Sequence, residues 1–434
     1  MSNKSALYLA VVVSAFFACK KDPVVTPPVD SFFSITLKNE YNPLQARLAV
    51  FLSDESGTVK AYRELPGSDT ARLEVPGSSR SDRFDCTIVK IITVDAPGSG
   101  LRDTFIYLTT YINLPDGEIV NLRNPVQNQT TDLNITFTGV TSVDSVIVPD
   151  GLTFVRPQPS NNFYGQYRVL HTGKLWLRVR VNGESMWRFI LFDNVTAPTL
   201  DATLDANLLL PIFATPKKIT LPFTAAWEYN VDGIVDTAAQ KFLAMGDLIR
   251  APGGAVPVYA SVDIFEPISN DVFDPGPKPY KGFRIRLKGA DPAAGGYTYI
   301  LDRFFADIPA TVPVPAFDLQ PTVLSDNRLV ATQCIGNFDA LVFSRHRAGT
   351  PNITWEVHLA PEAGIVAYRL PDVPDALGNQ FAPLKKYDFG GQVTARAENY
   401  DNISSYELVL RRRLLNDDPL WQAKAGYLGK EEVQ

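Results

Sequence analysis

Hydrophobic and polar residues alternate with a period of two in many segments of the chain. Between residues 175 and 181, Leu and Val occupy every other position and are separated by Trp and Arg; residues 133–137, 258–264 and 283–288 show the same alternation. Successive side chains of a β-strand point to opposite faces, so this pattern is typical of antiparallel sheets that bury one face and expose the other. The alternation predicts strands along most of the chain.

Other segments are apolar at nearly every position. Residues 48–52 and 104–112 are dense in β-branched and aromatic residues, which suits central strands. Turn sequences separate the predicted strands: residues 54–57, Pro66-Gly67, residues 115–117, Asn182-Gly183 and Gly295-Gly296. Short strands at this spacing predict an all-β fold built from immunoglobulin-like or related antiparallel β-sandwiches.

One segment has the pattern of a helix. Thr237 could cap residues 238–249, in which Phe242, Met245 and Ile249 would share a face. Gly246 counts against a helix, because glycine weakens helix interiors. We expect at most this one helix of ordinary length.

The length of the chain predicts two or three sandwiches in tandem. A polar, proline-bearing break covers residues 149–162, and a proline-spaced run covers 308–322. Prolines at such density cannot serve a central strand, so both runs are predicted linkers. The predicted domains are residues 31–148, 163–307 and 323–415, followed by a tail, 416–434, that either frays or docks through Trp421 and Tyr427.

Composition and charge narrow the function classes. Hydrophobic residues make up 45% of the chain and charged residues 20%, and the formal net charge is −6. A mildly acidic chain lacks the basic surface that binds nucleic acid, so we expect no nucleic-acid partner. The dense basic spot, Arg411–Arg413, lies among leucines, and we expect it at the solvated edge of a strand.

Cys86 and Cys334 belong to different predicted domains. We therefore favour two buried free thiols. A disulfide between them stays open, because an exported protein would permit one.

The sequence contains none of the common catalytic or metal-binding motifs. His171, His346 and His358 are isolated, and His358 lies on the polar face of an alternating strand, where we expect it at the solvent or an edge. Asp232 and Asp236 lack the ligand series of a calcium loop, and we expect a turn there. We therefore predict no catalytic residue, metal or cofactor, and no enzyme. A triad assembled from distant residues stays open.

Aromatic residues near predicted turns are the candidate ligand contacts. An exposed planar ring can stack on a sugar face or anchor a protein interface. The alternative is that these rings only bridge core and solvent. The candidates are Tyr164, Tyr167, Tyr280, Tyr297 and Tyr299.

The first thirty residues have the layout of an export signal. Lys4 precedes an apolar run, residues 6–18, that is too short to span a membrane as a helix. Cys19 ends this run and is followed by Lys20-Lys21-Asp22 and a proline-rich stretch, residues 23–30. An ordinary signal peptide cleaved near Ala15 or Ala18 is one interpretation.

The Cys-Lys-Lys-Asp start resembles that of envelope lipoproteins of the Bacteroidota. The resemblance implies that residues 1–18 are a signal peptide and that Cys19 carries fatty acyl chains, of which palmitate is a common one. Residues 19–30 would form the tether. It also implies attachment to the outer membrane, at the periplasmic face or the cell surface.

These observations predict a non-enzymatic, lipid-anchored envelope protein that presents β-sandwich binding modules. Its partner beyond the membrane would be a polysaccharide or another envelope protein. Two alternatives stay open: a glycan-binding subunit or polysaccharide-acting enzyme of the cell surface, and a structural or adhesion component.

Overall fold

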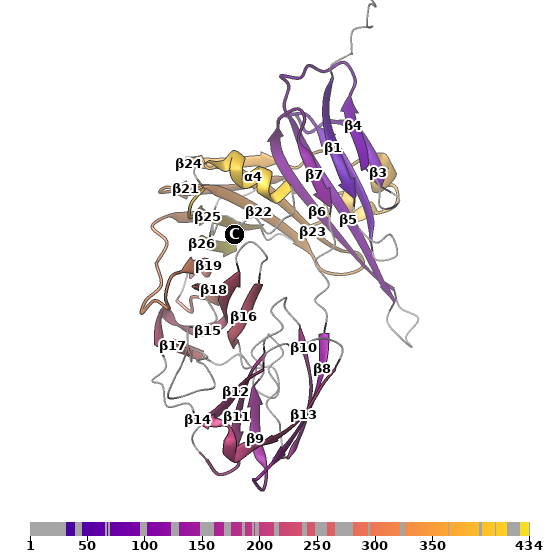
Figure 1. The fold of residues 1–434 in the computed structure, drawn as a ribbon. Helices are drawn as coiled ribbons and strands as arrows, with labels where there is room; N and C mark the ends of the chain where they lie inside the picture. Colours follow the sequence, from indigo (N-terminus) through magenta and orange to yellow (C-terminus); the bar gives the residue numbers. More distant parts are fainter. Residues whose placement is uncertain are drawn as a thin grey trace, which may run out of the picture.

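The computed structural model confirms the all-β prediction (Figure 1). It describes residues 32–39, 46–65, 67, 70–95, 102–122, 130–147, 160–168, 175–184, 187–192, 195, 199–211, 217–236, 241–247, 258–264, 281–293, 296–321, 326–362, 364–389, 393–403, 405–414 and 426–433. Strands dominate these residues, and the helices are short.

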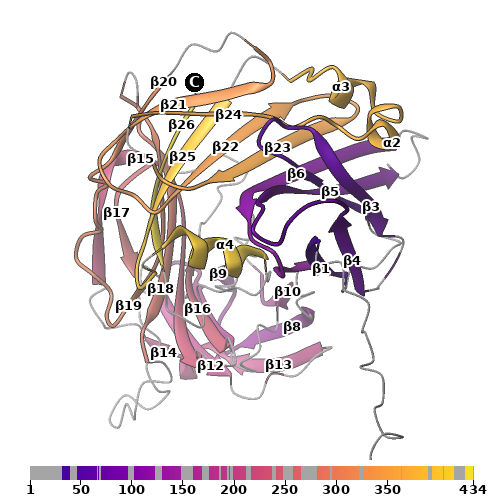
Figure 2. The same cartoon turned by 90° about the horizontal axis from the view of Figure 1, so that it is seen from above.

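A sheet of 13 strands runs through the described part of the chain. In Figure 2 it curves around helix α4 (Tyr406–Leu414). From edge to edge its order is β16 (Lys241–Asp247), β15 (Lys217–Asp236), β18 (Phe283–Ala290), β19 (Thr298–Phe305), β26 (Tyr427–Val433), β25 (Val393–Tyr400), β22 (Ala340–Arg347), β23 (Asn352–Leu359), β6 (Arg102–Leu114), β5 (Phe84–Asp95), β2 (Arg47–Ser53) and β3 (Val59–Leu65), while β17 (Val258–Ile264) pairs with β15 off this path.

The strands of this sheet pair antiparallel except at one seam. β23 runs parallel to β6, with Asn352 opposite Phe105 and His358 opposite Tyr111. Across the seam, the indole Nε1 of Trp355 donates to Thr110 Oγ1 at 2.9 Å. The seam therefore joins two parts of the chain that are far apart in sequence.

Both faces of the sheet near the seam are covered. On one face, β1 (Phe33–Asn39), β4 (Thr70–Val75) and β7 (Ile119–Leu122) form a second sheet and close a sandwich. Leu410 and Leu414 of α4 belong to the same core. On the other face lie β20 (Asp318–Pro321), β21 (Leu329–Ile335), β24 (Gly364–Arg369), α2 (Asp375–Gly378) and α3 (Ala382–Lys385), around a core that contains Trp355.

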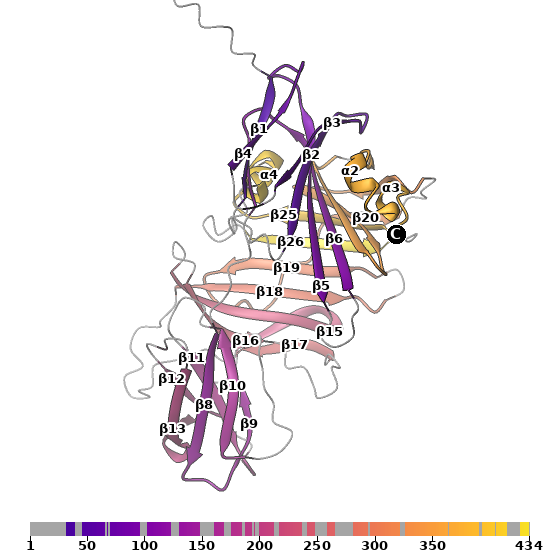
Figure 3. The same ribbon diagram turned by 90° about the vertical axis from the view of Figure 1, so that its right-hand side faces the viewer.

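A separate sandwich lies at the β15–β16 end of the large sheet (Figure 3). Its core contains Leu133, Phe137, Phe163 and Val179. Its sheets are β10 (Asn162–Arg168) with β8 (Thr130–Thr138) and β13 (Thr199–Asp205), and β14 (Leu210–Pro211) with β12 (Trp187–Phe192), β11 (Leu175–Val181) and β9 (Val143–Ile147); the 3-10 helix η1 (Ala206–Leu208) follows β13.

The sheets cross the borders predicted from the sequence. β8 and β9 precede the predicted break at 149–162, yet they pack with the strands that follow it. The predicted linker 308–322 is wrong as a free connection, because Ile308, Val312 and Phe317 are buried and β20 pairs with β21. Prolines within this run are compatible with packing, since most of it lies outside a strand ladder. The number of independently folding domains stays a prediction.

The structure tests three further predictions. The predicted helix over 238–249 is wrong: residues 241–247 form β16, because pairing with β15 outweighs a weak helical pattern interrupted by Gly246. The tail docks, since Tyr427 begins β26 between β19 and β25, whereas Trp421 lies outside the described residues. Cys86 and Cys334 are free and buried, as predicted, in two different cores.

Trp355 tests the seam. Its side chain is 0% exposed, so Trp355→Ala should lower the free energy of unfolding by about 3–5 kcal/mol through lost burial and a cavity. Ile365→Ala is the control, because Ile365 is 68% exposed and should change stability by less than about 0.5 kcal/mol. Urea unfolding of both variants measures the difference, and equal midpoints would contradict the packing described here.

Candidate functional site

Two of the five predicted aromatic contacts are packed. Tyr299 is buried, its hydroxyl donates to the Pro313 carbonyl at 2.8 Å, and its ring meets Trp227 edge-on at 5.4 Å. Tyr297 is half-buried, and Lys430 Nζ lies 4.4 Å from its ring centre. Tyr299 is therefore a core residue rather than a stacking platform, because its place on β19 points it into the second core of the large sheet.

Of the other three candidates, the structure describes the side chain of Tyr164 alone, and it does not join them. Tyr164 lies on β10 in the separate sandwich and is 71% exposed, so among the described candidates it is the platform that stays open to solvent. Tyr167 follows on the same strand, but its side chain lies outside the described part. Tyr280 lies outside the described residues altogether. The described candidates thus belong to different sheets and form no common surface.

A groove beside edge strand β3 is the better candidate. Its volume is about 670 Å³, and it lies between β3 and the segment that carries α2 and α3. The side chains that line it combine aromatic, basic and acidic groups: Tyr62, Arg328, Asp372, Asp375, Lys385 and Tyr387. No prediction pointed here, because the two walls are separated by some three hundred residues of sequence.

Arg328 lies at the floor of this groove. Its guanidinium donates to the Leu370 carbonyl, pairs with Asp372 Oδ1 at 2.9 Å, and lies 4.6 Å from the ring centre of Tyr387. The Tyr387 hydroxyl donates in turn to the Pro371 carbonyl at 2.8 Å. Tyr387 has a φ of +49°, which is unusual for a bulky residue. Such strain persists where surrounding contacts fix the backbone, as they do here.

The turn between β2 and β3 attaches the β3 side of the groove to the segment that carries α2 and α3. The backbone N–H of Asp372 donates to the Gly57 carbonyl at 2.7 Å. Gly57 has a φ of +83°, and a Cβ at this position would lie 3.1 Å from Pro371 Cα. Only glycine suits both the left-handed backbone and this close approach. The groove is therefore built into the fold rather than formed by loose surface loops.

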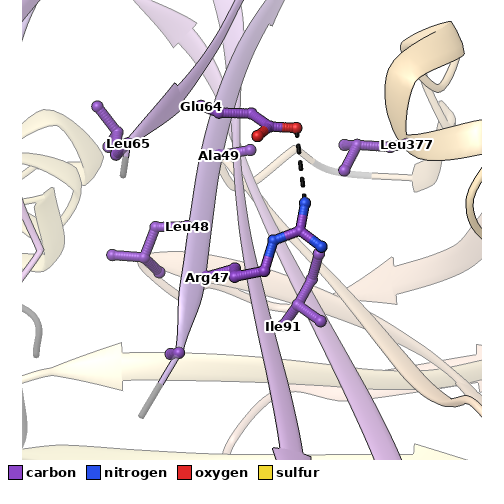
Figure 4. Close-up of a pocket in the computed structure, with 8 residues that line it drawn as sticks. Arg47, Leu48, Ala49, Glu64, Leu65, Ile91 and Leu377 are labelled. Atoms are coloured by element: carbon purple, nitrogen blue, oxygen red, sulfur yellow. Dashed lines mark ion pairs between the residues drawn. The ribbon is translucent and has the colours of Figure 1, made fainter. Parts of the chain in front are cut away.

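A smaller hollow adjoins the groove along the same strand (Figure 4). Its volume is about 240 Å³, and Leu48, Leu65, Ile91 and Leu377 give it an apolar floor. Arg47 and Glu64 lie 3.7 Å apart at its rim. The Tyr62 hydroxyl, which lines the larger groove, donates to Glu64 Oε1 at 2.7 Å, so the two hollows meet along β3.

The charges around both hollows are paired with one another. Besides Arg328 with Asp372 and Arg47 with Glu64, Lys385 pairs with Asp375 at 3.1 Å. The two exposed pairs, Arg47 with Glu64 and Lys385 with Asp375, contribute little to stability. Their donors and acceptors can therefore exchange partners with a ligand at small cost. The site suits binding of a polar ligand without a strong preference for charge.

A second polar cluster is buried where α4 meets the large sheet. Arg413 of α4 contacts His358, Glu398 and Tyr400 with its guanidinium. Tyr400 donates to Glu398 at 2.6 Å, and the ring of Tyr111 stacks on His358 at 4.9 Å. These groups come from α4 and from strands β6, β23 and β25, so the cluster holds the helix against the sheet.

Burial and charge shift the pKa values in this cluster. Burial, reinforced by the charges of Arg413 and Arg396, lowers the pKa of His358 well below its usual value. Burial also acts to raise the pKa of Glu398, but the same two guanidiniums outweigh it and hold that pKa below its usual value. Glu398 is therefore ionised and His358 neutral near pH 7.

Three sequence predictions are wrong in this region and its neighbourhood. Arg411–Arg413 lie on a helix rather than at a strand edge, and Arg413 is turned inward to Glu398. His358 is 6% exposed, because α4 covers the strand face predicted to be wet. Asp232 lies inside the 20-residue strand β15 and pairs with Arg286, which rules out a turn at its position.

Comparisons with known proteins assign no family to the chain. No protein-family model matches the chain, and no curated protein matches it. Within the described ranges, no group of three or more His, Cys, Asp or Glu residues could hold a metal ion. The same ranges contain no helix that is long and apolar enough to cross a membrane.

The pKa of His358 predicts a pH dependence of stability. The unfolded chain takes up a proton on this histidine below about pH 6.5, whereas the folded chain resists it. Stability should therefore fall as the pH drops from 7 to 5, with a limiting slope of about 1.4 kcal/mol per pH unit from this group. The stabilisation that comes from ionised Glu398 is lost only at lower pH, below the ordinary pKa of a glutamate.

Urea unfolding at pH 7, 6 and 5 measures this dependence. His358→Gln keeps an acceptor for Arg413 and should flatten the slope relative to the parent. His346→Gln is the matched control, because His346 is exposed and should leave the slope unchanged. Equal slopes for the parent and His358→Gln would contradict the buried, neutral state of His358.

Proposed function

We propose that the protein is a non-enzymatic, lipid-anchored protein of the outer membrane that presents the β3 groove to a ligand. The observation that carries the proposal is the groove itself, with its fixed walls and mutually paired charges. Paired donors and acceptors favour recognition over chemistry, since none of these pairs joins a nucleophile to a base.

The N-terminal sequence supports the anchor. Cys19 follows an apolar export segment and precedes a proline-rich stretch. Two or more acyl chains hold a protein stably on a membrane, whereas one chain binds only marginally. The described fold begins soon after this stretch, with β1 at Phe33, so residues 19–30 are the proposed tether.

The proposed ligand is another envelope protein or a polysaccharide. Tyr62 supplies a half-buried aromatic surface, and the neighbouring ion pairs supply donors and acceptors of both kinds. A glycan-binding subunit or a polysaccharide-acting enzyme is the second candidate function, favoured by the same combination of aromatic and polar groups. A purely structural or adhesive role has less support, because such a role requires no groove.

The anchor is tested by the intact mass and detergent partitioning of the native protein beside a Cys19→Ala variant. We expect a triacylated Cys19 in the native protein and loss of the variant from the membrane fraction. An unmodified native protein that is released in soluble form would overturn the anchor while leaving the groove proposal intact.

The groove is tested by placing a photo-crosslinking amino acid at position 385 in living cells. Lys385 lines the groove and its side chain is 55% exposed, so a bound partner should give a discrete adduct on irradiation. Tyr62→Ala should abolish that adduct, while the same crosslinker at exposed Lys38 of β1 is the control for random encounters. Adducts of equal yield at both positions, or an adduct that is indifferent to Tyr62→Ala, would refute the groove as the binding site.

A further inference from the structure

Strand β3 is an edge of the large sheet and pairs on one side only. Its residues pair antiparallel with β2. Among the described residues, no backbone hydrogen bond joins the other side of β3 to a further strand. Residues 59–64 are half-buried or exposed. The free side of β3 therefore offers the alternating backbone N–H and C=O groups with which an added strand would pair.

The charged side chains of β3 do not guard this edge with a free charge. Charged residues, lysine above all, commonly protect an exposed edge from pairing with another chain. In β3, Lys60 Nζ lies 2.8 Å from Asp54 Oδ2. Arg63 Nη1 donates to the Arg72 carbonyl at 3.1 Å, and Glu64 belongs to the ion pair at the rim of the smaller hollow. Each charge of β3 is thus engaged within its own chain.

The groove and the smaller hollow follow one another along β3. The groove is lined by Val59 and Tyr62 of this strand, and the hollow by Glu64 and Leu65. Val59 and Leu65 are the two ends of the strand, and at about 3.3 Å per residue they lie roughly 20 Å apart. An extended segment of about six or seven residues therefore reaches both hollows.

The lining of the two hollows defines the side chains of such a segment. The smaller hollow, of about 240 Å³, has an apolar floor and is bounded on the far side by Leu377 of α2 (Figure 4), so it suits one large apolar side chain. The groove is lined by two basic and two acidic side chains: Arg328, Lys385, Asp372 and Asp375. Their charges balance, which favours a segment without net charge.

We propose that β3 binds an extended, uncharged peptide segment of a partner protein, which adds a strand to the large sheet and places one apolar side chain in the smaller hollow. This inference rests on the proposed function, because it names the ligand of the same groove. Main-chain hydrogen bonds would supply affinity and the hollow specificity, as in other cases of strand addition.

The observations favour a peptide over a saccharide. A peptide strand repeats its N–H and C=O groups with the spacing of β3 itself, whereas a saccharide has no such repeat. Sugar hydroxyls would also face the apolar floor of the smaller hollow, where they find no hydrogen-bond partner at a cost in free energy.

The first test is selection from a displayed library of random linear peptides about twelve residues long, which exceeds the length of the site. The target is the full mature protein in detergent. Enriched peptides should share a large apolar residue and carry no net charge. The best of them, made synthetically, should bind in isothermal titration.

Two variants locate the binding. Tyr62→Ala removes a side chain that lines the groove and should weaken binding by about tenfold or more. Arg63→Ala is the matched control, because Arg63 is exposed on the same strand and lines neither hollow. It should leave the affinity unchanged. Matching circular dichroism spectra verify that each variant is folded.

N-methylation of the peptide, one position at a time, tests the strand pairing. Each methyl group removes one N–H donor, and every second N–H of an antiparallel strand points to its neighbour. Binding should therefore fall by about tenfold at alternate positions and persist at the positions between them. Equal losses at consecutive positions, or no loss anywhere, would overturn the pairing.

Titration with cellohexaose, maltohexaose and xylohexaose is the parallel arm, and none should bind at concentrations up to about 10 mM. A saccharide that binds the parent but not Tyr62→Ala would overturn the peptide and keep the groove as a binding site. A selection that enriches no peptide, or peptides that are indifferent to Tyr62→Ala, would also overturn the inference. The crosslink at position 385 separately decides whether the groove has a ligand in cells.

Discussion

The parallel pairing of β23 with β6 is the constraint on which the rest of the structure depends. It joins residues 352–358 to residues 105–111 and thereby turns two separate groups of strands into one sheet. Without it, the core around Trp355 would lose one side, since that core draws on both β5 and β6 and on β22 and β23. The hydrogen bonds from Trp355 to Thr110 and between Thr110 and Thr87 fix the seam from inside. Parallel pairing over such a sequence distance carries a large loop-closure cost, which burial on both faces of the sheet offsets.

This constraint also places the groove and the ion pairs of β15, β18 and β19, Arg284 with Asp302 and Arg286 with Asp232, towards opposite ends of the same sheet. The groove lies at the β3 edge, where the turn at Gly57 meets the segment from Leu370 to Asp372. The ion pairs of β15, β18 and β19 lie towards the other edge. Between them, the Arg413–Glu398 cluster docks α4 on the same curved sheet.

Much of the fold could be predicted from local pattern, and little of the candidate sites could. Residues 175–181, 258–264 and 283–288 alternate because each strand has one buried face, and they are β11, β17 and β18. The same alternation led to wrong predictions of solvent exposure where the polar face of a strand is also covered. Arg284, His358 and Arg413 are polar residues whose partners, Asp302 or Glu398, come from other strands or from a helix, and only the tertiary pairing shows that they are buried. The groove could not be predicted from the sequence for the same reason, because Tyr62 and Arg328 are far apart in the chain and share no local motif. The helix predicted for residues 241–247 was wrong for a different reason. The residues do have helical spacing, but they pair with β15 as a strand.

The most direct test of this account is a disulfide across the seam. Thr109 and Glu356 are partners on β6 and β23, and paired strand positions lie within the Cα separation that a disulfide needs. Thr109→Cys with Glu356→Cys should therefore crosslink under mild oxidation and leave the circular dichroism spectrum unchanged, as intact-mass and spectroscopic measurements would show. Thr109→Cys with Ser344→Cys, one strand further away on β22, should remain reduced. A crosslink in the control alone, or in neither pair, would contradict the single sheet on which the account rests.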